Sequence, residues 1–246
     1  MVGLLKVKEN EENLVLLFST PNKTNTYIRY SDDKLKDMYD HNFFEAQNID
    51  EKLLLKFYEI KEERREGHLK ISSKCEEKCL KLHNFEEEIL LTMLKNDYDI
   101  FNIIQRDGLI FKNLKEDNIF DDIISLELLE YGEIYGRSFT IRKMHRYASK
   151  ILEKNNGLNY HACYLGNLLV GYCYTYYDQG VVGLDGLLVR KEYRHQGIAS
   201  TLIKHIANFY NCPIYLHADE EESPRYLYEK LGFKIIDKTY DYLIVD

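Results

Sequence analysis

Three apolar segments that lead through a basic loop into an amphipathic helix constrain the fold of this chain more than any other feature. The segments 158–165 and 168–177 are separated by Gly166-Asn167, a dipeptide typical of a two-residue β-hairpin turn. The third segment, 181–189, is followed by a loop and then by apolar residues that recur every three or four positions. The sequence therefore predicts three neighbouring strands that connect directly to a helix.

Apolar periodicity and turn residues extend this α/β pattern over the chain from residue 108 onward. Asp117 or Asn118 is expected to cap the first helix, and Ser223 with Pro224 is expected to open the last one. The expected elements are, in chain order, a strand at 109–111, helices at 117–129 and 138–154, the three strands above, a helix at 197–211, a strand at 214–216, a helix at 223–232, and strands at 234–236 and 240–245.

The N-terminal half has weaker patterns. Its expected elements are strands at 14–18 and 26–30, a helix opening at Ser31, a helix at 50–67, a strand at 68–72, a helix at 85–94 and a strand at 98–104. The last three resemble the strand-helix-strand order near the C-terminus, and Met93 takes the position of Tyr228 if Tyr98 is aligned with Phe233. We therefore expect two domains, an accessory α/β domain at residues 1–107 and a second domain at residues 108–246. One interpretation is that the first is a degenerate copy of the second.

Charge and cysteine content exclude several classes of protein. Residues 1–116 hold 19 basic and 23 acidic side chains and residues 117–246 hold 14 and 18, so each half carries a net charge of −4. No basic face is available for nucleic acid, and a cationic substrate suits the charge better. Five irregularly spaced cysteines and the absence of a signal-peptide core indicate a reducing, cytoplasmic compartment. The uncharged stretch 155–177 contains polar residues and a turn, so it is not expected to span a membrane.

The loop and helix start at residues 194–200 have the features of a phosphate-binding site. Backbone N–H groups at the start of a helix have no intrahelical acceptor and attract anions. Glycine at position 197 permits close approach, Ala199 adds little bulk, and Arg194 adds a positive charge. A pyrophosphate is the expected ligand, and His195 is as consistent with solvent as with phosphate.

Arg194-x-x-Gly197-x-Ala199 after a strand resembles the acyl-CoA-binding motif of the GNAT superfamily of N-acyltransferases, Arg/Gln-x-x-Gly-x-Gly/Ala. The segment from Tyr228 to Phe233, Tyr-Glu-Lys-Leu-Gly-Phe, resembles the helix that follows in that family. The resemblance covers about residues 108–246. It implies an α/β fold with a mixed, mostly antiparallel central sheet flanked by helices.

The resemblance also implies a cofactor site and a catalytic acid. Acetyl-CoA would place its pantetheine along the third strand and its pyrophosphate on the loop; the residues implied are Leu187, Leu188, Val189, Arg194, His195, Gln196, Gly197, Ile198, Ala199 and Ser200. Tyr228 would protonate the departing CoA thiolate. Phenol and thiol pKa values of about 10 and 8.5 suit this role.

The general base is less well defined by the sequence. The glutamate of histone-type members falls at Gly183, which has no side chain. Asp185 is the only acid in its strand and is the candidate catalytic base, with structural hydrogen bonding as the alternative. Asp178, Asp219 or an ordered water could take the same role.

The resulting hypothesis is an N-acetyltransferase that moves the acetyl group of acetyl-CoA to a primary amine by direct transfer, without a metal. The acceptor could be a small molecule or a peptide, and a homodimer is one option for the assembly. The alternatives are a non-catalytic acyl-CoA-binding or regulatory protein, and an N-terminal half that selects a protein acceptor. Two patterns are attributed to packing: Cys75, Cys79 and His83 at helical spacing, and the alternating Tyr172, Tyr174 and Tyr176.

Overall fold

The computed structural model describes residues 3–64, 70–76, 85–97, 106–153, 155–221 and 224–244. They form two compact units. The first unit comprises residues 1–11, 93–217 and 223–234, and the second comprises residues 12–92, 218–222 and 235–246. The domain boundary predicted between residues 107 and 108 stays a prediction.

The first unit is built on a mixed sheet with the strand order β10-β9-β8-β7-β6. Neighbouring strands are antiparallel except β9 and β10, which are parallel. The strands are β6 (Leu109–Asn113), β7 (Leu158–Leu165), β8 (Leu168–Asp178), β9 (Val181–Val189) and β10 (Ile214–Asp219). The predicted hairpin and the predicted strand at 214–216 are both confirmed.

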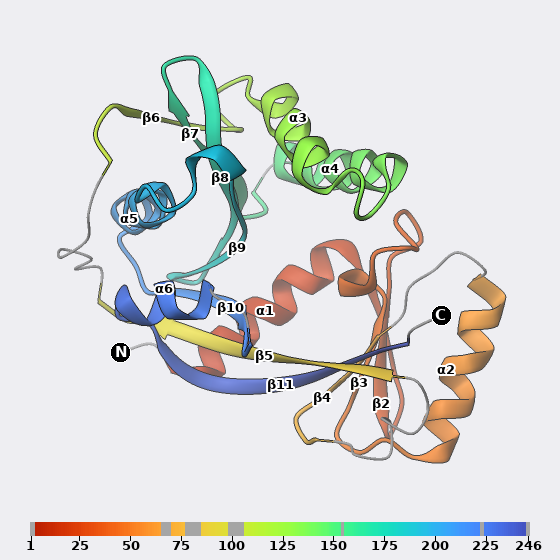
Figure 1. The fold of residues 1–246 in the computed structure, drawn as a ribbon. Coiled ribbons are helices and arrows are strands. Elements are labelled where there is room, and N and C mark those ends of the chain that lie inside the picture. The colour runs from red at the N-terminus through yellow and green to blue at the C-terminus, as the bar shows by residue number, and fades with distance from the viewer. Residues whose placement is uncertain are drawn as a thin grey trace. The chain divides into compact units, whose positions relative to one another are not determined.

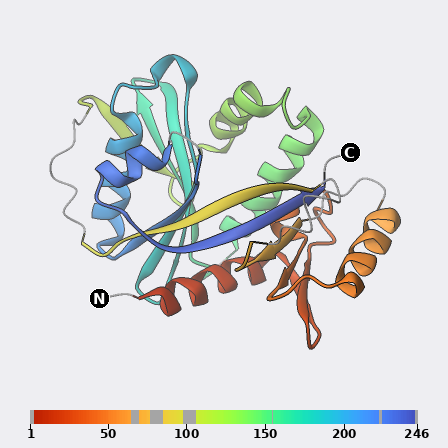
Figure 2. The same ribbon diagram turned by 60° about the horizontal axis from the view of Figure 1, so that its bottom comes forward.

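Helices lie on both faces of this sheet, as Figures 1 and 2 show. Helices α3 and α4 lie on one side of β7, β8 and β9, and α5 lies on the other. Side chains on β8 alternate accordingly: the Tyr172 hydroxyl binds Glu127 on α3, whereas Thr175 binds Tyr210 on α5. The helices of the first unit are α3 (Phe120–Tyr131), α4 (Arg137–Leu152), α5 (Ile198–Tyr210), α6 (Pro224–Lys230) and the start of α1 (Leu4–Phe18).

A histidine lies buried between the sheet and α5. His161 on β7 is 0% exposed, its Nε2 lies 3.2 Å from the Tyr210 hydroxyl, and its Nδ1 has no hydrogen-bond partner among the described residues. Burial first, and then the neighbouring His205 and Lys115, lower the pKa of His161 to about 3. The folded protein therefore keeps this imidazole neutral at pH values near 6.5, at which the histidine of the unfolded chain becomes protonated.

This histidine should make the protein sensitive to acid. The pKa of histidine is about 6.5 in the unfolded chain, so below that pH the unfolded state binds a proton that the folded state does not. The contribution of neutral His161 to the free energy of unfolding is therefore fully present above pH 6.5 and decreases as the pH falls toward 3. Between pH 6.5 and 5 we expect His161 to account for a loss of about 2 kcal/mol in the free energy of unfolding. Denaturant titrations at the two pH values should show that His161→Gln reduces the difference and that His145→Gln, at an exposed histidine of α4, does not. An unchanged difference in His161→Gln would contradict the assignment.

The strands of the second unit follow the order β1-β2-β3-β4-β11-β5. Its elements are β1 (Thr20–Lys23), β2 (Tyr27–Ser31), a 3₁₀ turn (Tyr39–His41), β3 (Phe43–Ala46), α2 (Glu51–Arg64), β4 (Lys70–Ser73), β5 (Phe85–Lys95) and β11 (Lys234–Ile244). Aromatic and aliphatic side chains of α2 and the strands, including Phe44, Phe57 and Tyr242, form its core. The predicted strand at 26–30 and helix at 50–67 are confirmed for the described residues.

Several expected elements are wrong. Residues 14–18 complete the helix α1, and residues 85–94 form the strand β5, so the proposed alignment of Met93 with a helical Tyr228 fails. Ser31 ends a strand instead of opening a helix. Neither Asp117 nor Asn118 caps α3, because the helix has Ile119 at its N-cap position, without a side-chain cap. The Asp117 carboxylate instead accepts the backbone N–H of Asn113.

The expected C-terminal strands are merged in the structure, and some other predictions fall outside the described residues. The strands expected at 234–236 and 240–245 are one continuous strand, β11. The strand at 98–104, the residues Cys79 and His83, and the predicted cap Ser223 lie outside the described residues.

A buried ion-pair cluster joins the strands of the second unit. Lys70 on β4 donates to Asp241 on β11 at 2.6 Å and to Asp40 at 2.9 Å, and Ser72 donates to the other oxygen of Asp241. Asp241 is 1% exposed. Burial opposes the charge on Lys70, but Asp40 and Asp241 together raise its pKa, so the lysine stays protonated.

Removal of the lysine charge should destabilise the protein strongly. Lys70→Met leaves the buried Asp241 without its cation, and we expect a loss of about 3 kcal/mol in the free energy of unfolding. Lys74→Met is the control, because Lys74 is 44% exposed and its pair with Asp237 should contribute less than about 1 kcal/mol. Urea denaturation measures both, and equal effects would show that burial of the Lys70 pair is unimportant.

Candidate active site

The edge of β9 is partly free of a neighbouring strand. The register pairs β10 with β9 at Val182, Gly183 and Leu184. Along residues 185–189 of β9, the paired neighbour is β8 alone among the described strands. The backbone there can therefore pair with an extended ligand on its other edge.

A β-bulge interrupts β9 at this free edge. Tyr172 pairs with Leu188 and Tyr174 with Asp185, so Gly186 and Leu187 together face the single residue Cys173. Gly186 has φ of +58°, and a Cβ there would lie 3.0 Å from the Tyr174 ring, so the position favours glycine. A bulge leaves backbone groups of its strand unpaired, which adds potential contacts for a ligand near Leu187.

Beyond Val189 the chain forms the loop that was predicted to bind phosphate. After a short 3₁₀ turn at Lys191–Tyr193, His195 and Gly197 adopt positive φ values of +60° and +78°. The helix α5 then begins at Ile198, and the N–H of Thr201 binds the Gly197 carbonyl at 3.0 Å. In the described structure no acceptor binds the backbone N–H groups of residues 197–200. The loop therefore presents a helix N-terminus with unpaired donors, as predicted.

Side chains hold this loop from two directions. Arg194 donates through Nε to the Val189 carbonyl at 3.0 Å and through Nη2 to Glu130 at 2.7 Å. At the other end, the Arg106 guanidinium donates to the side chain of Gln196. The exposed His195 and Gln196 and the half-buried Ala199 stand around the helix start, while Ile198 and Ser200 are buried.

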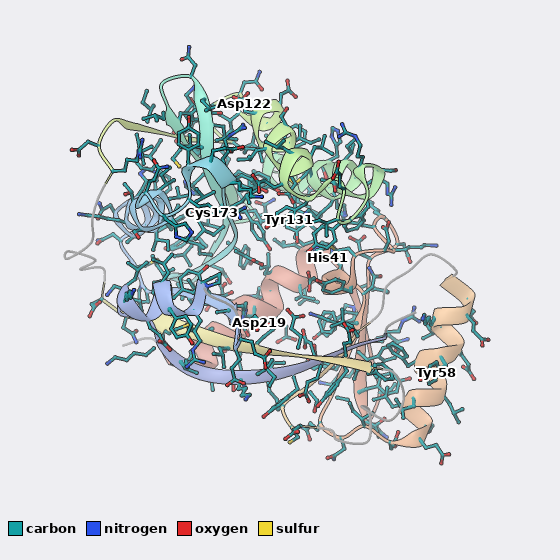
Figure 3. All side chains as sticks on the ribbon, in the orientation of Figure 1. His41, Tyr58, Asp122, Tyr131, Cys173 and Asp219 are labelled. Atoms are coloured by element: carbon teal, nitrogen blue, oxygen red, sulfur yellow. The ribbon has the colours of Figure 1, made fainter. Side chains whose placement is uncertain are left out.

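The helix α3 carries acidic side chains toward the sheet and the loop. Glu127 is 2% exposed and binds both Lys143 and the Tyr172 hydroxyl, and Glu130 lies one turn further along. Figure 3 marks α3 by Asp122 near its start and Tyr131 at its end. Burial raises the pKa of Tyr131, and the positive charge of Arg194 opposes that shift.

The candidate base Asp185 is exposed and held by two hydrogen bonds. The Tyr174 hydroxyl donates to Oδ2 at 2.5 Å, and the Gly186 N–H donates to Oδ1 at 2.6 Å. Burial, followed by the charge of Asp185, raises the pKa of Tyr174 well above 10, so this phenol stays protonated. The ring of Tyr147 on α4 lies 5.1 Å from that of Tyr174. Asp185 thus stands beside an aromatic cluster on the α3 and α4 side of the sheet.

The position of Gly183 is filled by a neighbouring tyrosine. A Cβ at Gly183 would lie 2.6 Å from the Tyr215 hydroxyl. That hydroxyl donates at 2.8 Å to Asn10, whose side-chain amide binds the carbonyls of Asp178 and Val181. A longer side chain at residue 183 would displace this buried network, which explains why glycine stands there.

Tyr228 lies on α6 and is 7% exposed. Its carbonyl accepts the N–H groups of Leu231 and Phe233, and its ring meets Phe233 edge-on at 6.0 Å. The segment from Tyr228 to Phe233 therefore forms a compact helix end with its tyrosine in a fixed position. Its catalytic role stays a prediction.

The other candidate acids have structural contacts. Asp219 belongs to the second unit, and its Oδ1 accepts the Glu221 N–H at 2.7 Å. Asp178 ends β8, and its carbonyl accepts a hydrogen bond from Asn10. The tyrosines at 172, 174 and 176 do share one strand face, and Tyr172 and Tyr174 contact α3 and α4 through Glu127 and Tyr147.

Three residues near the site were not predicted from the sequence, namely Glu130, Tyr174 and Tyr215. Glu130 was one acid among several on α3, Tyr174 was assigned to packing, and Tyr215 was part of a short apolar strand. The register that places them beside Arg194, Asp185 and Gly183 arises from tertiary structure.

Within the described ranges, no group of three or more histidine, cysteine, aspartate or glutamate residues is placed to hold a metal ion. None of the helices described is long and apolar enough to cross a membrane.

A known family model matches part of the chain. Residues 156–235 match the family model of the acetyltransferase (GNAT) domain. No curated protein matches the chain by sequence. The match contains the bulged strand β9, the loop, α5 and the segment from Tyr228 to Phe233.

Solved structures share the fold over nearly the whole chain. A functionally unknown conserved protein from Staphylococcus epidermidis ATCC 12228 has a TM-score of 0.77 at 17% identity, covering 92% of this chain and 94% of its own. A GCN5-related N-acetyltransferase from Kribbella flavida has a TM-score of 0.70 at 10% identity, with coverages of 100% and 97%. A tandem GNAT protein from the clavulanic acid biosynthesis pathway has a TM-score of 0.52 at 9% identity, with coverages of 96% and 94%. Residues 156–235 thus match the acetyltransferase (GNAT) domain by sequence, and the chain shares its fold with solved GNAT structures.

Proposed function

We propose that the protein is an N-acetyltransferase that transfers the acetyl group of acetyl-CoA directly to a primary amine. The observation that carries this proposal is the succession of a free, bulged strand edge and an uncapped helix N-terminus at residues 185–200. An extended pantetheine can pair with the first, and a pyrophosphate can bind the second.

The residues of the loop fit such a ligand. Gly197 has a backbone conformation that L side chains rarely adopt, and Ala199 is small, so the approach to the N–H groups of α5 is unobstructed. Arg194 is 44% exposed and retains guanidinium N–H groups beyond the two used by Val189 and Glu130. Leu187, Leu188 and Val189 would supply the backbone contacts to pantetheine.

The chemistry requires one base and one acid. The amine, with a pKa of about 10.4 if it resembles lysine, must lose a proton before it attacks the thioester carbonyl. A C–N bond then forms, the C–S bond breaks, and the thiolate takes a proton. We assign the acid to Tyr228 and the base to Asp185, directly or through a water molecule.

Asp185 suits an amine acceptor in a second way. Its carboxylate is exposed and fixed by Tyr174 and by the Gly186 N–H, so it can bind a cationic amine as well as accept its proton. The protein's net charge of −8 favours the approach of a cation. The acceptor is a small molecule or a peptide that carries such an amine.

One observation favours a second candidate function, a non-catalytic acyl-CoA-binding protein. The position of the histone-type glutamate is a glycine whose side-chain space is filled by Tyr215. A protein of this kind would retain cofactor affinity without turnover. The second unit would then serve as an accessory or regulatory domain, and the cytoplasmic location remains a prediction in either case.

Two measurements on the purified protein test the proposal. Calorimetric titration with acetyl-CoA should show saturable micromolar binding, with dephospho-CoA and ATP as controls. Thiol release should then be screened against polyamines, amino sugars, amino acids and peptides. Binding with release of CoA supports the enzyme, binding without release in any amine class supports the binding protein, and no binding by a folded sample contradicts both.

A further inference from the structure

The carboxylate of Glu130, near the end of α3, binds at two points the loop between β9 and α5, residues 190–197, which is predicted to bind the cofactor. Its Oε1 accepts the backbone N–H of Lys191 at 3.0 Å, and its Oε2 accepts Nη2 of Arg194 at 2.7 Å. The side chain of Glu130 is only 10% exposed, whereas that of Arg194 is 44% exposed. The mostly buried carboxylate of Glu130 therefore binds the partly exposed guanidinium of Arg194, which lies on a loop distant in sequence.

The contacts fix the plane of the Arg194 guanidinium. Nε donates to the Val189 carbonyl at the end of β9, while Nη2 donates to Glu130. A planar group held at two of its five N–H donors has little freedom to rotate. The described residues offer no acceptor to its other N–H groups, so these are available to an anion in a defined direction.

We propose that Glu130 is a positioning residue that holds Arg194 and the turn at Lys191–Tyr193 in the shape that binds the pyrophosphate of acetyl-CoA. The inference rests on the proposed function and extends it to a residue outside the cofactor motif. A loop already held in its binding shape loses less conformational entropy when the ligand arrives. Glu130 thus acts through Arg194 and need not touch the cofactor.

Glu130 could also lower the affinity for acetyl-CoA, and this opposite effect makes the proposal testable. Glu130 is negative and lies next to the group that should attract the pyrophosphate, so its charge alone would weaken binding. Loss of positioning lowers affinity, whereas loss of the charge raises it. The sign of the change in affinity therefore separates the two.

The experiment compares the affinities of the full-length protein for acetyl-CoA and for acetyl-pantetheine, which lacks the pyrophosphate. Glu130→Ala should weaken acetyl-CoA binding by about tenfold, the value of one charge-assisted hydrogen bond, and should leave acetyl-pantetheine binding unchanged. Glu130→Gln, which keeps an acceptor for Lys191 but has no charge for Arg194, should lie between Glu130→Ala and the wild type. Glu133→Ala is the matched control, because it removes an exposed acid three residues along the chain.

Each outcome has a distinct meaning. Equal or tighter acetyl-CoA binding by Glu130→Ala overturns the positioning role, and an equal loss for both ligands overturns it too, because it indicates general damage to the fold. If Glu130→Ala does not fold, Glu130→Gln decides by the same criteria. Failure of the wild type to bind acetyl-CoA overturns the proposed function itself, which the wild-type titration reveals before any variant is made.

Discussion

Gly197→Glu is expected to abolish measurable acetyl-CoA binding. The new carboxylate would enter the space in front of the α5 N-terminus, where the pyrophosphate is proposed to bind. Two unit charges 4 Å apart repel by about 4 kcal/mol near a protein surface, which corresponds to a loss of roughly 10³-fold in affinity. Calorimetric titration with acetyl-CoA measures the change.

Controls must separate charge from backbone strain, because Gly197 has a φ of +78°. Ala199→Glu places the same charge in the first turn of α5, where an acid is favourable for the helix, so it should keep the fold and still lose binding. Asn167→Glu in the exposed β7–β8 turn adds one negative charge away from the loop and should bind normally. Retained affinity in both Gly197→Glu and Ala199→Glu would mean that the loop is not the phosphate site.

The elements that the sequence predicted well are those with local determinants. The β7–β8 hairpin follows from Gly166-Asn167 and its flanking apolar runs, and Gly166 indeed has φ of +61°. The helix α5 follows from its regular apolar positions, which are buried at Ile198, Leu202 and Ile206. In each case, residues within about twenty positions of one another determine the element.

The wrong assignments in the N-terminal half have a common physical cause. In β5 the residues from Leu91 to Lys95 are all buried, so no alternation marks a strand, and apolar residues spaced by three and four resembled a helix. In α1 the five apolar residues from Leu14 to Phe18 resembled a strand. The helical repeat becomes visible only when the buried Val7 and Asn10 are included.

The candidate site shows the same division between local and long-range information. The loop motif and the α5 N-terminus are local, so the positive φ of Gly197 and the unpaired helix start agree with what the motif predicts. The contacts from Glu130 to Arg194 and from Tyr174 to Asp185 join residues 64 and 11 positions apart. They depend on strand register and helix packing, which composition and periodicity do not specify.

Tyr228→Phe tests whether Tyr228 donates the proton to the departing CoA thiolate. Loss of a general acid typically lowers turnover by 10²-fold to 10⁴-fold, and we expect a fall in kcat of at least about 10²-fold. Because phenylalanine keeps the ring that packs against Phe233, the affinity for acetyl-CoA should stay nearly unchanged. Steady-state thiol release with an accepted amine gives kcat, and calorimetry gives the affinity.

The same helix supplies the control. Tyr226 is 61% exposed and two residues away, so Tyr226→Phe removes a hydroxyl from α6 without touching the buried position and should leave kcat at the wild-type value. A thermal unfolding midpoint for each variant shows whether the loss of the Tyr228 hydroxyl disturbs the fold. Equal kcat values for Tyr228→Phe and the wild type would exclude a proton from this phenol, and protonation of the thiolate would then have to come from solvent.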